Sequence, residues 1–338
     1  MRIFIQHIFL FIFVFQATAQ LSDFTHISFE KADEIALEYK DETLHNLPDL
    51  VYKLTSQLDT DVERFRAIFK WVCSSIANDY NLYKRNKRNR YRYRNDSVKL
   101  NAWNTKFQKI VFKQLLRNRS TICTGYAYLV KELANLADIE CEMIHGYGRT
   151  STINLKKLDS PNHSWNAVKL NGKWYLCDPT WASGNPNPET YHFEFDFNDG
   201  FFLAEPKIFA VNHHPIDKKW FLIEGNTPSF QDFMQAPIIY NKAYSYFSDH
   251  NYPQKMHNAI KRNDPLNFTL QLQKEVDTED VNLIIENSFR ERKVHPKQVS
   301  IQDKSLSIDY KFEYSGFYDV HLYIKDDLIS TYTVEVTR

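Results

Sequence analysis

A predicted β-hairpin over residues 162–181, NHSWNAVKLNGKWYLCDPTW, constrains the fold of this chain more than any other segment. Two runs rich in aromatic and β-branched residues flank Asn171-Gly172, a dipeptide typical of a two-residue hairpin turn. This turn pairs position 165 with position 178. Because side chains alternate between the two faces of a strand, we expect His163 and Asp178 on one face, within reach of each other.

A cysteine precedes this hairpin in the stretch STICTGYAYLVKELANLA. Apolar residues there recur at helical spacings and predict a helix with one buried face. We expect Ser120 and Thr121 to cap it, and the apolar stripe continued backward places Cys123 in the first turn, on the buried face. The positive end of the helix dipole stabilises a thiolate at that position. Gly125 is expected to let another backbone or a substrate approach closely.

Cys123, His163 and Asp178 are the candidate catalytic residues of the chain. Taken singly, a cysteine on a helix face or a histidine on an aromatic strand is usually explained by packing. Taken together, a thiol, an imidazole and a carboxylate supply a nucleophile, a general base and a group that orients the base. The sequence therefore predicts nucleophilic thiol chemistry.

The first residues, MRIFIQHIFLFIFVFQATAQ, predict a secretory signal peptide. A basic Arg2 precedes a short apolar run, and Ala-Thr-Ala at 17–19 has the small residues of a cleavage site. The run is shorter than the roughly 20 apolar residues of a membrane-spanning helix, and no later stretch is long enough. We expect cleavage near Ala19, no transmembrane anchor, and a mature protein that is secreted, periplasmic or on the cell surface.

Charge is balanced overall but uneven locally. The chain has 42 Lys and Arg against 42 Asp and Glu, which does not favour sequence-specific binding to nucleic acid. The segment 84–94, KRNKRNRYRYR, nevertheless carries seven basic residues and two tyrosines. We interpret it as a solvated loop between two helices. The alternative is a surface for an anionic partner.

The cysteine count alone does not decide the redox state of the chain. Four cysteines lie beyond the predicted leader, at positions 73, 123, 141 and 177. Disulfides are the default in an oxidising compartment, but a chain of this length folds without them. Cys141 and Cys177 both lie on predicted strands of one sheet, so a disulfide between them is one alternative.

Three motifs in this chain resemble the core pattern of the transglutaminase-like superfamily. They read CTGYA from Cys123, HSWN from His163, and WY at 174–175 followed by DPTW from Asp178. The stretches 66–80 and 201–225 are similar to the branch that includes kyphoscoliosis peptidase and a yeast cytokinesis protein. The resemblance covers roughly residues 60–225.

The resemblance implies an α+β, papain-like core in which the nucleophile helix packs on an antiparallel sheet. It also implies thiol acyl transfer, with Cys123 as nucleophile, His163 as general base and Asp178 as orienting acid. Resolution of the thioester by water makes the enzyme a cysteine-type peptidase or amidase, which we favour, whereas resolution by an amine makes it a protein-glutamine acyltransferase. The implied substrate is a protein or peptide, and no cofactor is expected. The alternative is a catalytically inactive surface module that binds a peptide or polyanion.

One stretch departs from the family pattern. Related proteins have Asn-Ile-x-Tyr-Asp where this chain has Ser75-Ile76-Ala77-Asn78-Asp79. The missing Asn and Tyr bear on the shape of the groove and on the oxyanion donors. The first donor is expected to be the backbone N–H of Cys123, and the second has no sequence signature.

Three further histidines are interpreted as structural. His213 and His214 stand near Asp217, but neighbouring residues rarely point at one ion, so no metal is expected. His213 matches a family position, and we expect it to pack in the cleft wall. His145 is expected in the core, on a strand adjoining the hairpin.

The composition changes beyond about residue 240. The stretch YNKAYSYFSDHNYPQK is interpreted as a connection, and the alternating runs after it predict an immunoglobulin-like β-sandwich. Tyr318 entering a strand resembles the tyrosine corner of such domains. We therefore expect a signal peptide over 1–19, a transglutaminase-like domain over 20–235, and a linker with the sandwich over 236–338.

Overall fold

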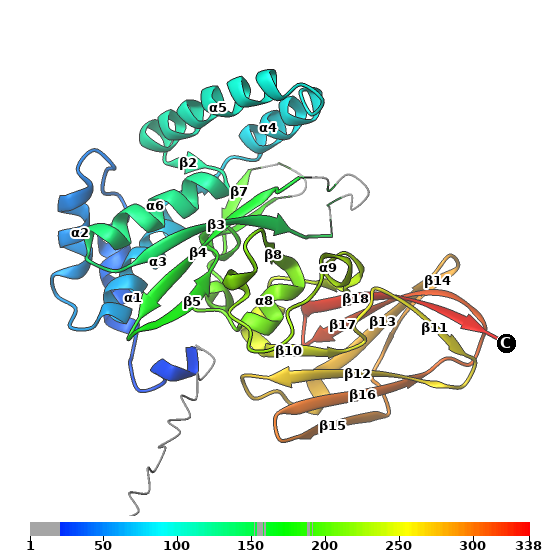
Figure 1. The fold of residues 1–338 in the computed structure, drawn as a ribbon. Coiled ribbons are helices and arrows are strands. Elements are labelled where there is room, and N and C mark those ends of the chain that lie inside the picture. The colour runs from blue at the N-terminus through cyan, green and yellow to red at the C-terminus, as the bar shows by residue number, and fades with distance from the viewer. Residues whose placement is uncertain (1–20, 152, 154–157, 159, 188–189, 191) are drawn as a thin grey trace, which may run out of the picture.

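A computed structural model describes residues 21–151, 153, 158, 160–187, 190 and 192–338. The predicted signal peptide lies outside these residues. The expected α+β fold class is confirmed, with helices and a mixed set of strands up to about residue 240 and strand-rich sheets after it (Figure 1). Among the described residues no helix is both long and apolar enough to cross a membrane.

The N-terminal half is built around a four-stranded sheet in the order β5-β4-β3-β8. Its strands are β3 (Cys141–Gly148), β4 (His163–Leu170), β5 (Lys173–Cys177) and β8 (His213–Pro215). The predicted hairpin is confirmed in its register, because Asn166 pairs with Cys177 and Leu170 with Lys173. Both turn residues have positive φ, 50° at Asn171 and 81° at Gly172, as a tight two-residue turn requires.

Helices cover this sheet and supply the candidate nucleophile. Helix α6 packs against β3 and β4, and α3 packs against α6. A capping box formed by Thr60 and Glu63 starts α3. Apart from α3, α6, α4 and α5, the helices and 3₁₀ turns of this half have nine residues or fewer. The bounds are η1 (Leu21–Phe24), α1 (Glu30–Glu38), α2 (Leu47–Thr55), α3 (Asp61–Ser75), α6 (Cys123–Leu136), α7 (Pro179–Ser183), η3 (Asp199–Phe201), α8 (Pro206–Asn212), η4 (Lys218–Phe221) and α9 (Phe230–Gln235).

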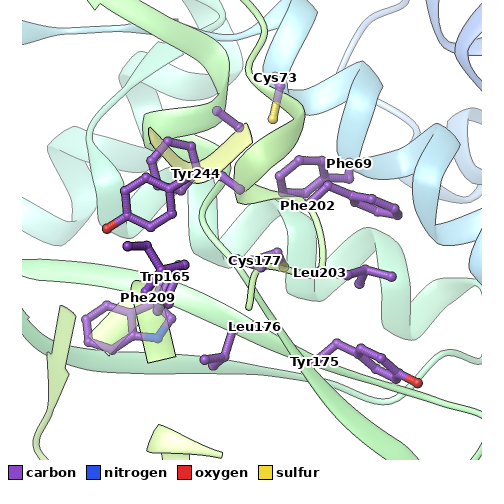
Figure 2. Packing of buried hydrophobic residues seen from close by; sticks show 14 of the residues in the cluster. Phe69, Cys73, Trp165, Tyr175, Leu176, Cys177, Phe202, Leu203, Phe209 and Tyr244 are labelled. Carbon is purple, nitrogen blue, oxygen red and sulfur yellow. The ribbon is translucent and has the colours of Figure 1, made fainter. Parts of the chain in front are cut away.

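The core beneath the sheet is rich in aromatic residues. Figure 2 shows Phe69 of α3 beside Phe202, with ring centroids 5.4 Å apart, and Cys177 of β5 among the same buried side chains. Trp165 of β4 packs against Phe209 of α8 at 6.1 Å. This packing fixes the strand ends that carry His163 and Asp178.

The basic segment 84–94 is helical, so its interpretation as a loop is wrong. It belongs largely to α4 (Tyr80–Arg92), which pairs with α5 (Ser97–Asn118). The Asp79 side chain caps α4 by accepting from the backbone N–H of Leu82 at 2.8 Å, and Leu82 is buried against α5 side chains. Figure 1 shows α4 and α5 on the side of α6 that faces away from the C-terminal strands.

Two short strands join this helical pair to the body of the protein. They are β1 (Ala77–Asn78) and β2 (Ser120–Thr121), which pair in parallel. The Asp79 backbone N–H donates to the Thr121 carbonyl oxygen at 2.7 Å. The start of α4 is therefore held beside Thr121, two residues before α6 begins.

The C-terminal region forms two facing sheets that are compatible with the expected sandwich. Five strands predicted from alternating runs, β12, β13, β16, β17 and β18, are confirmed, and the Tyr318 hydroxyl donates to the Tyr314 carbonyl oxygen at 3.0 Å, as in a tyrosine corner. The strand orders are β10-β12-β16-β15 and β11-β18-β17-β13-β14, with β9 on β18. The bounds are β9 (Ile238–Ile239), β10 (Phe247–Tyr252), β11 (His257–Lys261), β12 (Pro265–Leu272), β13 (Val281–Asn287), β14 (Arg290–Val294), β15 (Gln298–Gln302), β16 (Ser305–Lys311), β17 (Gly316–Ile324) and β18 (Asp327–Thr337).

The stretch 240–255 is more than a connection, which corrects the sequence interpretation. It contains α10 (Ala243–Tyr246) and β10, and both Tyr244 and Phe247 are buried. Just before it, the buried Arg149 guanidinium donates to the carbonyl oxygens of Ala236 and Pro237. These hydrogen bonds tie the segment just after the expected domain boundary, at 235 and 236, to the N-terminal half. The position of that boundary stays a prediction.

Candidate functional site

Cys123 is the first residue of the fourteen-residue helix α6, and its side chain is half-buried. Ile122 occupies the N-cap position and provides no side-chain cap. The expected capping by Ser120 and Thr121 is therefore wrong, because these residues pair with β1 instead. The thiol still lies at the positive end of the helix dipole, as expected.

Gly125 allows a close approach, but the approaching group belongs to the same chain. A Cβ atom on Gly125 would lie 1.9 Å from the Thr121 Oγ1 atom. The backbone N–H of Gly125 donates to the Ile122 carbonyl oxygen at 2.8 Å. Glycine is thus required where the strand β2 turns sharply into α6.

His163 begins β4 and Asp178 follows β5 directly, which places them side by side. The His163 Nε2 atom lies 2.7 Å from the Asp178 Oδ2 atom, so the two side chains are within reach as the hairpin register predicts. Burial by itself lowers the pKa of His163, but the charge of Asp178, its hydrogen bond and a hydrogen bond with Cys123 raise that pKa to about 10. An imidazole therefore connects the thiol to the carboxylate.

Asp178 is fully buried and uses both carboxylate oxygens. Its Oδ1 atom accepts from the backbone N–H groups of Thr180 at 2.9 Å and Trp181 at 3.2 Å, which caps α7. Burial favours the neutral acid, yet the charge and hydrogen bond of His163, with a hydrogen bond from His213, hold the pKa of Asp178 well below its usual range. The carboxylate is therefore ionised.

Asn166 fixes the distance between the helix and the hairpin. Its Nδ2 group donates to the Ala127 carbonyl oxygen of α6 at 2.8 Å and to the Glu142 carbonyl oxygen of β3 at 3.3 Å. Tyr126 adds a second anchor, because its hydroxyl donates to the Ile76 carbonyl oxygen at 2.5 Å. These two motif residues position Cys123 relative to His163.

Known proteins are similar to this chain over part of its length. Residues 48–179 match the family model of the transglutaminase-like superfamily. This chain contains a transglutaminase-like domain. Human kyphoscoliosis peptidase is 31% identical over 198 residues, which cover 58% of this chain and 27% of the relative. Hillarin of Drosophila melanogaster is 25% identical over 244 residues, which cover 67% of this chain and 27% of the relative.

The similarity to these relatives is partial in length. Mouse kyphoscoliosis peptidase is 30% identical over 220 residues, 64% of this chain and 30% of the relative. The chain thus spans less than a third of the length of the three relatives named here.

His213 lies behind Asp178, so its expected place in the cleft wall is wrong. Its ring is buried, its Nε2 atom lies 3.0 Å from Asp178 Oδ2, and it stacks on Phe209 with ring centroids 3.7 Å apart. Burial lowers the pKa of His213 to about 4, although the hydrogen bond to Asp178 opposes that shift. His213 therefore presents a neutral imidazole to the same carboxylate oxygen that His163 contacts.

His163, Asp178 and His213 bring three ligand-type atoms within 4.8 Å of one another. A tetrahedral zinc ion with bonds of about 2.0–2.1 Å holds its ligand atoms roughly 3.3 Å apart. The 2.7 Å between His163 Nε2 and Asp178 Oδ2 is shorter and is a hydrogen-bond distance. The arrangement fits a hydrogen-bonded ion pair better than a metal ion. His214, the neighbour in sequence, packs among Phe221, Phe230 and Phe233 instead.

A cavity of about 1110 Å³ opens between the domain and the helices α4 and α5, with Cys123 and His163 among its lining residues. His145 also lines it, and its ring is exposed, so the expected core position is wrong. The His145 Nδ1 atom lies 2.9 Å from the Ser164 hydroxyl oxygen. The cavity is large enough to admit an extended peptide beside the thiol.

Tyr83 of α4 lines the same cavity and packs against a cluster that contains Ile122. Burial raises the pKa of its hydroxyl, and the nearby Cys123 charge raises it further. Sequence reasoning missed this residue, because its place beside Cys123 arises from the β1–β2 pairing.

The four cysteines are free thiols, so the alternative of a Cys141–Cys177 disulfide is wrong. Cys73, Cys141 and Cys177 are buried, and burial raises the pKa of each of them. Of the four cysteines, Cys123 is partly exposed and the other three are buried. It alone is placed to meet a substrate.

Proposed function

We propose that the chain is an exported thiol enzyme that acts on amide bonds of proteins or peptides through a thioester. The observation that carries this proposal is the chain of contacts from Cys123 through His163 to Asp178. Hydrolysis is favoured over crosslinking. Export rests on the predicted signal peptide, with cleavage near Ala19.

In the proposed mechanism His163 already carries the proton, in keeping with its raised pKa, and the Cys123 thiolate of this ion pair attacks the substrate carbonyl carbon. Asp178 stabilises the imidazolium through the 2.7 Å contact with Nε2. His163 then donates the proton to the departing amine, which leaves a thioester on Cys123. Water, activated by His163, attacks the thioester and releases the acid, whereas an amine in place of water forms a new amide.

The oxyanion of the tetrahedral intermediate needs donors beside Cys123. The backbone N–H of Cys123, among the first N–H groups of α6, is one donor in this proposal. We assign the role of second donor to the Tyr83 hydroxyl. Tyr83 lines the same cavity, and it is close enough to Cys123 for the charge of the thiolate to raise the pKa of its hydroxyl. Such a donor from α4 compensates for the Asn and Tyr that the segment 75–79 lacks.

A catalytically silent module that binds a peptide or polyanion is the second candidate. The observation that favours it is the basic character of α4, which borders the cavity. It predicts that Cys123 has no unusual reactivity. A single labelling experiment separates it from the enzyme.

The test is the pH dependence of iodoacetamide labelling, read by peptide mass mapping on the folded mature protein. An enzyme gives rapid labelling of Cys123 near pH 6 that slows in His163→Ala, while the three buried thiols stay unlabelled. Tyr52→Phe, at an exposed position far from the site, serves as the control. Labelling of Cys123 that is slow at pH 6 and indifferent to His163 contradicts the proposed enzyme.

A further inference from the structure

The helical pair α4–α5 carries a charge that the remainder of the chain balances. Residues 80–118, called the roof hairpin below, contain twelve Lys and Arg and one acidic residue, Asp96. The roof hairpin therefore has a formal charge of +11 in a chain whose formal charge is zero. Charge of one sign is concentrated in one contiguous helical unit.

Part of this charge faces the catalytic cavity. Five cations of the roof hairpin line the cavity that contains Cys123 and His163, and no Asp or Glu is among its described lining residues. These cations are Lys84, Lys87, Arg88, Arg90 and Arg94. A cleft lined by one sign of charge within low-dielectric walls concentrates the opposite charge inside it.

Arg90 extends this basic wall across the cavity. Its guanidinium donates to the Pro161 carbonyl oxygen at 3.0 Å, two residues before His163. Tyr83, seven residues before Arg90 on the same helix, lies near Cys123. The cations therefore line α4 from the nucleophile toward the segment that carries the general base.

We propose that the roof hairpin selects acidic peptide segments as substrates, so that carboxylates flanking the reacting amide lie against α4. This inference rests on the proposed function, because it names the substrate class of that same site. Carboxylates form charge-assisted hydrogen bonds with Lys and Arg side chains. The apolar lining residues Phe107, Val111 and Met143 accommodate the uncharged parts of the peptide.

The alternative interpretation of this charge is that a polyanion binds to the outer face of the roof hairpin. A shallow hollow on α4 is lined by cations that include Arg85 and Arg92, and neither of these lines the catalytic cavity. Lys87 and Arg94 line the catalytic cavity and not the hollow. All four residues are exposed. Each pair contains a cation that lies over an aromatic ring, Arg94 over Tyr91 and Arg85 over Trp103, so the two double replacements lose contacts of the same kind.

The binding experiment uses the full mature chain with Cys123→Ala. The probe is a dansyl-labelled peptide with one central glutamine flanked by aspartates, compared with its isostere in which asparagines replace the aspartates. We expect the acidic peptide to bind more tightly, and Lys87→Gln with Arg94→Gln to weaken it about tenfold. The matched pair Arg85→Gln with Arg92→Gln is expected to leave the affinity unchanged. Equal weakening by both pairs means that the overall charge attracts the peptide without selection in the cavity, and greater weakening by the Arg85 and Arg92 pair means outer-face binding; either result overturns the inference.

Turnover of both peptides by the chain with Cys123 intact separates this inference from the proposed function. Selective binding without turnover of either peptide supports acidic selection and contradicts the enzyme. Turnover of both peptides at equal kcat/KM supports the enzyme and overturns acidic selection. Turnover of the acidic peptide alone supports both the proposed enzyme and its selection of acidic substrates.

Discussion

The Nε2 atom of His213 lies 3.0 Å from Asp178 Oδ2, the same oxygen that contacts His163. The Nδ1 atom of His213 lies 3.1 Å from the Phe209 carbonyl oxygen, so both ring nitrogens face acceptors. A neutral imidazole has a single N–H to donate. Because a carboxylate is the stronger acceptor, we place the proton on Nε2, where it stabilises the ionised Asp178.

Replacement of His213 is expected to lower catalysis without weakening substrate binding. His213→Phe keeps a ring on Phe209 but removes the hydrogen bond to Asp178, which is worth about 1.5–3 kcal/mol for a charged partner. We expect kcat to fall about tenfold to hundredfold with KM unchanged, and His213→Gln to restore part of kcat. His214→Phe, whose ring does not contact Asp178, is the control. A fall in kcat that Gln does not relieve at all means that His213 has only a packing role.

His163 is expected to make folding stability depend on pH in the alkaline range. Its pKa is raised from 6.5 to about 10 in the folded protein, so the folded state holds the proton more tightly. The resulting stabilisation is complete below pH 6.5 and is lost as the pH rises toward 10. In a Cys123→Ser background, the free energy of unfolding in urea should therefore fall over this range relative to His163→Gln. A constant difference between the two proteins contradicts the prediction.

Removal of the Tyr83 hydroxyl is expected to slow the chemical step. Tyr83→Phe keeps the ring but not the proposed oxyanion donor, and the loss of one such donor costs about 10²–10³-fold in kcat. Iodoacetamide labelling of Cys123, which forms no oxyanion, should stay nearly unchanged. Tyr91→Phe, at an exposed position that also lines the cavity, is the matched control. Equal effects of both substitutions on kcat argue against a specific donor.

A side chain at Gly125 is expected to destabilise the start of α6. The added Cβ of Gly125→Ala meets Thr121 Oγ1 at 1.9 Å, and overpacking of this kind costs about 1–3 kcal/mol. Thermal unfolding should show the loss, and Thr121→Ala in the same protein should restore part of it. Gly172→Ala is a useful contrast, because its Cβ meets no atom within 4 Å and its cost comes from the positive φ of 81°.

The arrangement of Cys123, His163 and Asp178 was predictable from sequence because it depends on short-range patterns. The Asn171-Gly172 turn fixes the hairpin register, and the register alone places His163 beside Asp178. The helical stripe likewise puts Cys123 at the start of α6. Strands such as β12 and β13 were recognisable because their buried and exposed residues alternate.

The missed features depend on contacts between distant segments. His213 reaches Asp178 across 35 positions of sequence, and no spacing pattern indicates that contact. Helix α4 buries only Leu82, so it lacks an apolar stripe and was mistaken for a loop, although its capping residue Asp79 was readable. Strands β11 and β14 are short, largely exposed and rich in polar residues, which hides their periodicity.

The close pairing of β1 and β2 means that the roof hairpin enters and leaves the body of the protein at one place. Strands that pair in this way lie about 4.8 Å apart, so the two ends of the inserted segment nearly meet. Segments with adjoining ends tolerate exchange and changes of length, because closing a longer loop adds little entropy cost. The proposed determinants of substrate preference thus lie on one inserted segment, whereas Cys123, His163 and Asp178 lie outside it, and an exchanged segment needs to keep only the hydroxyl proposed at Tyr83.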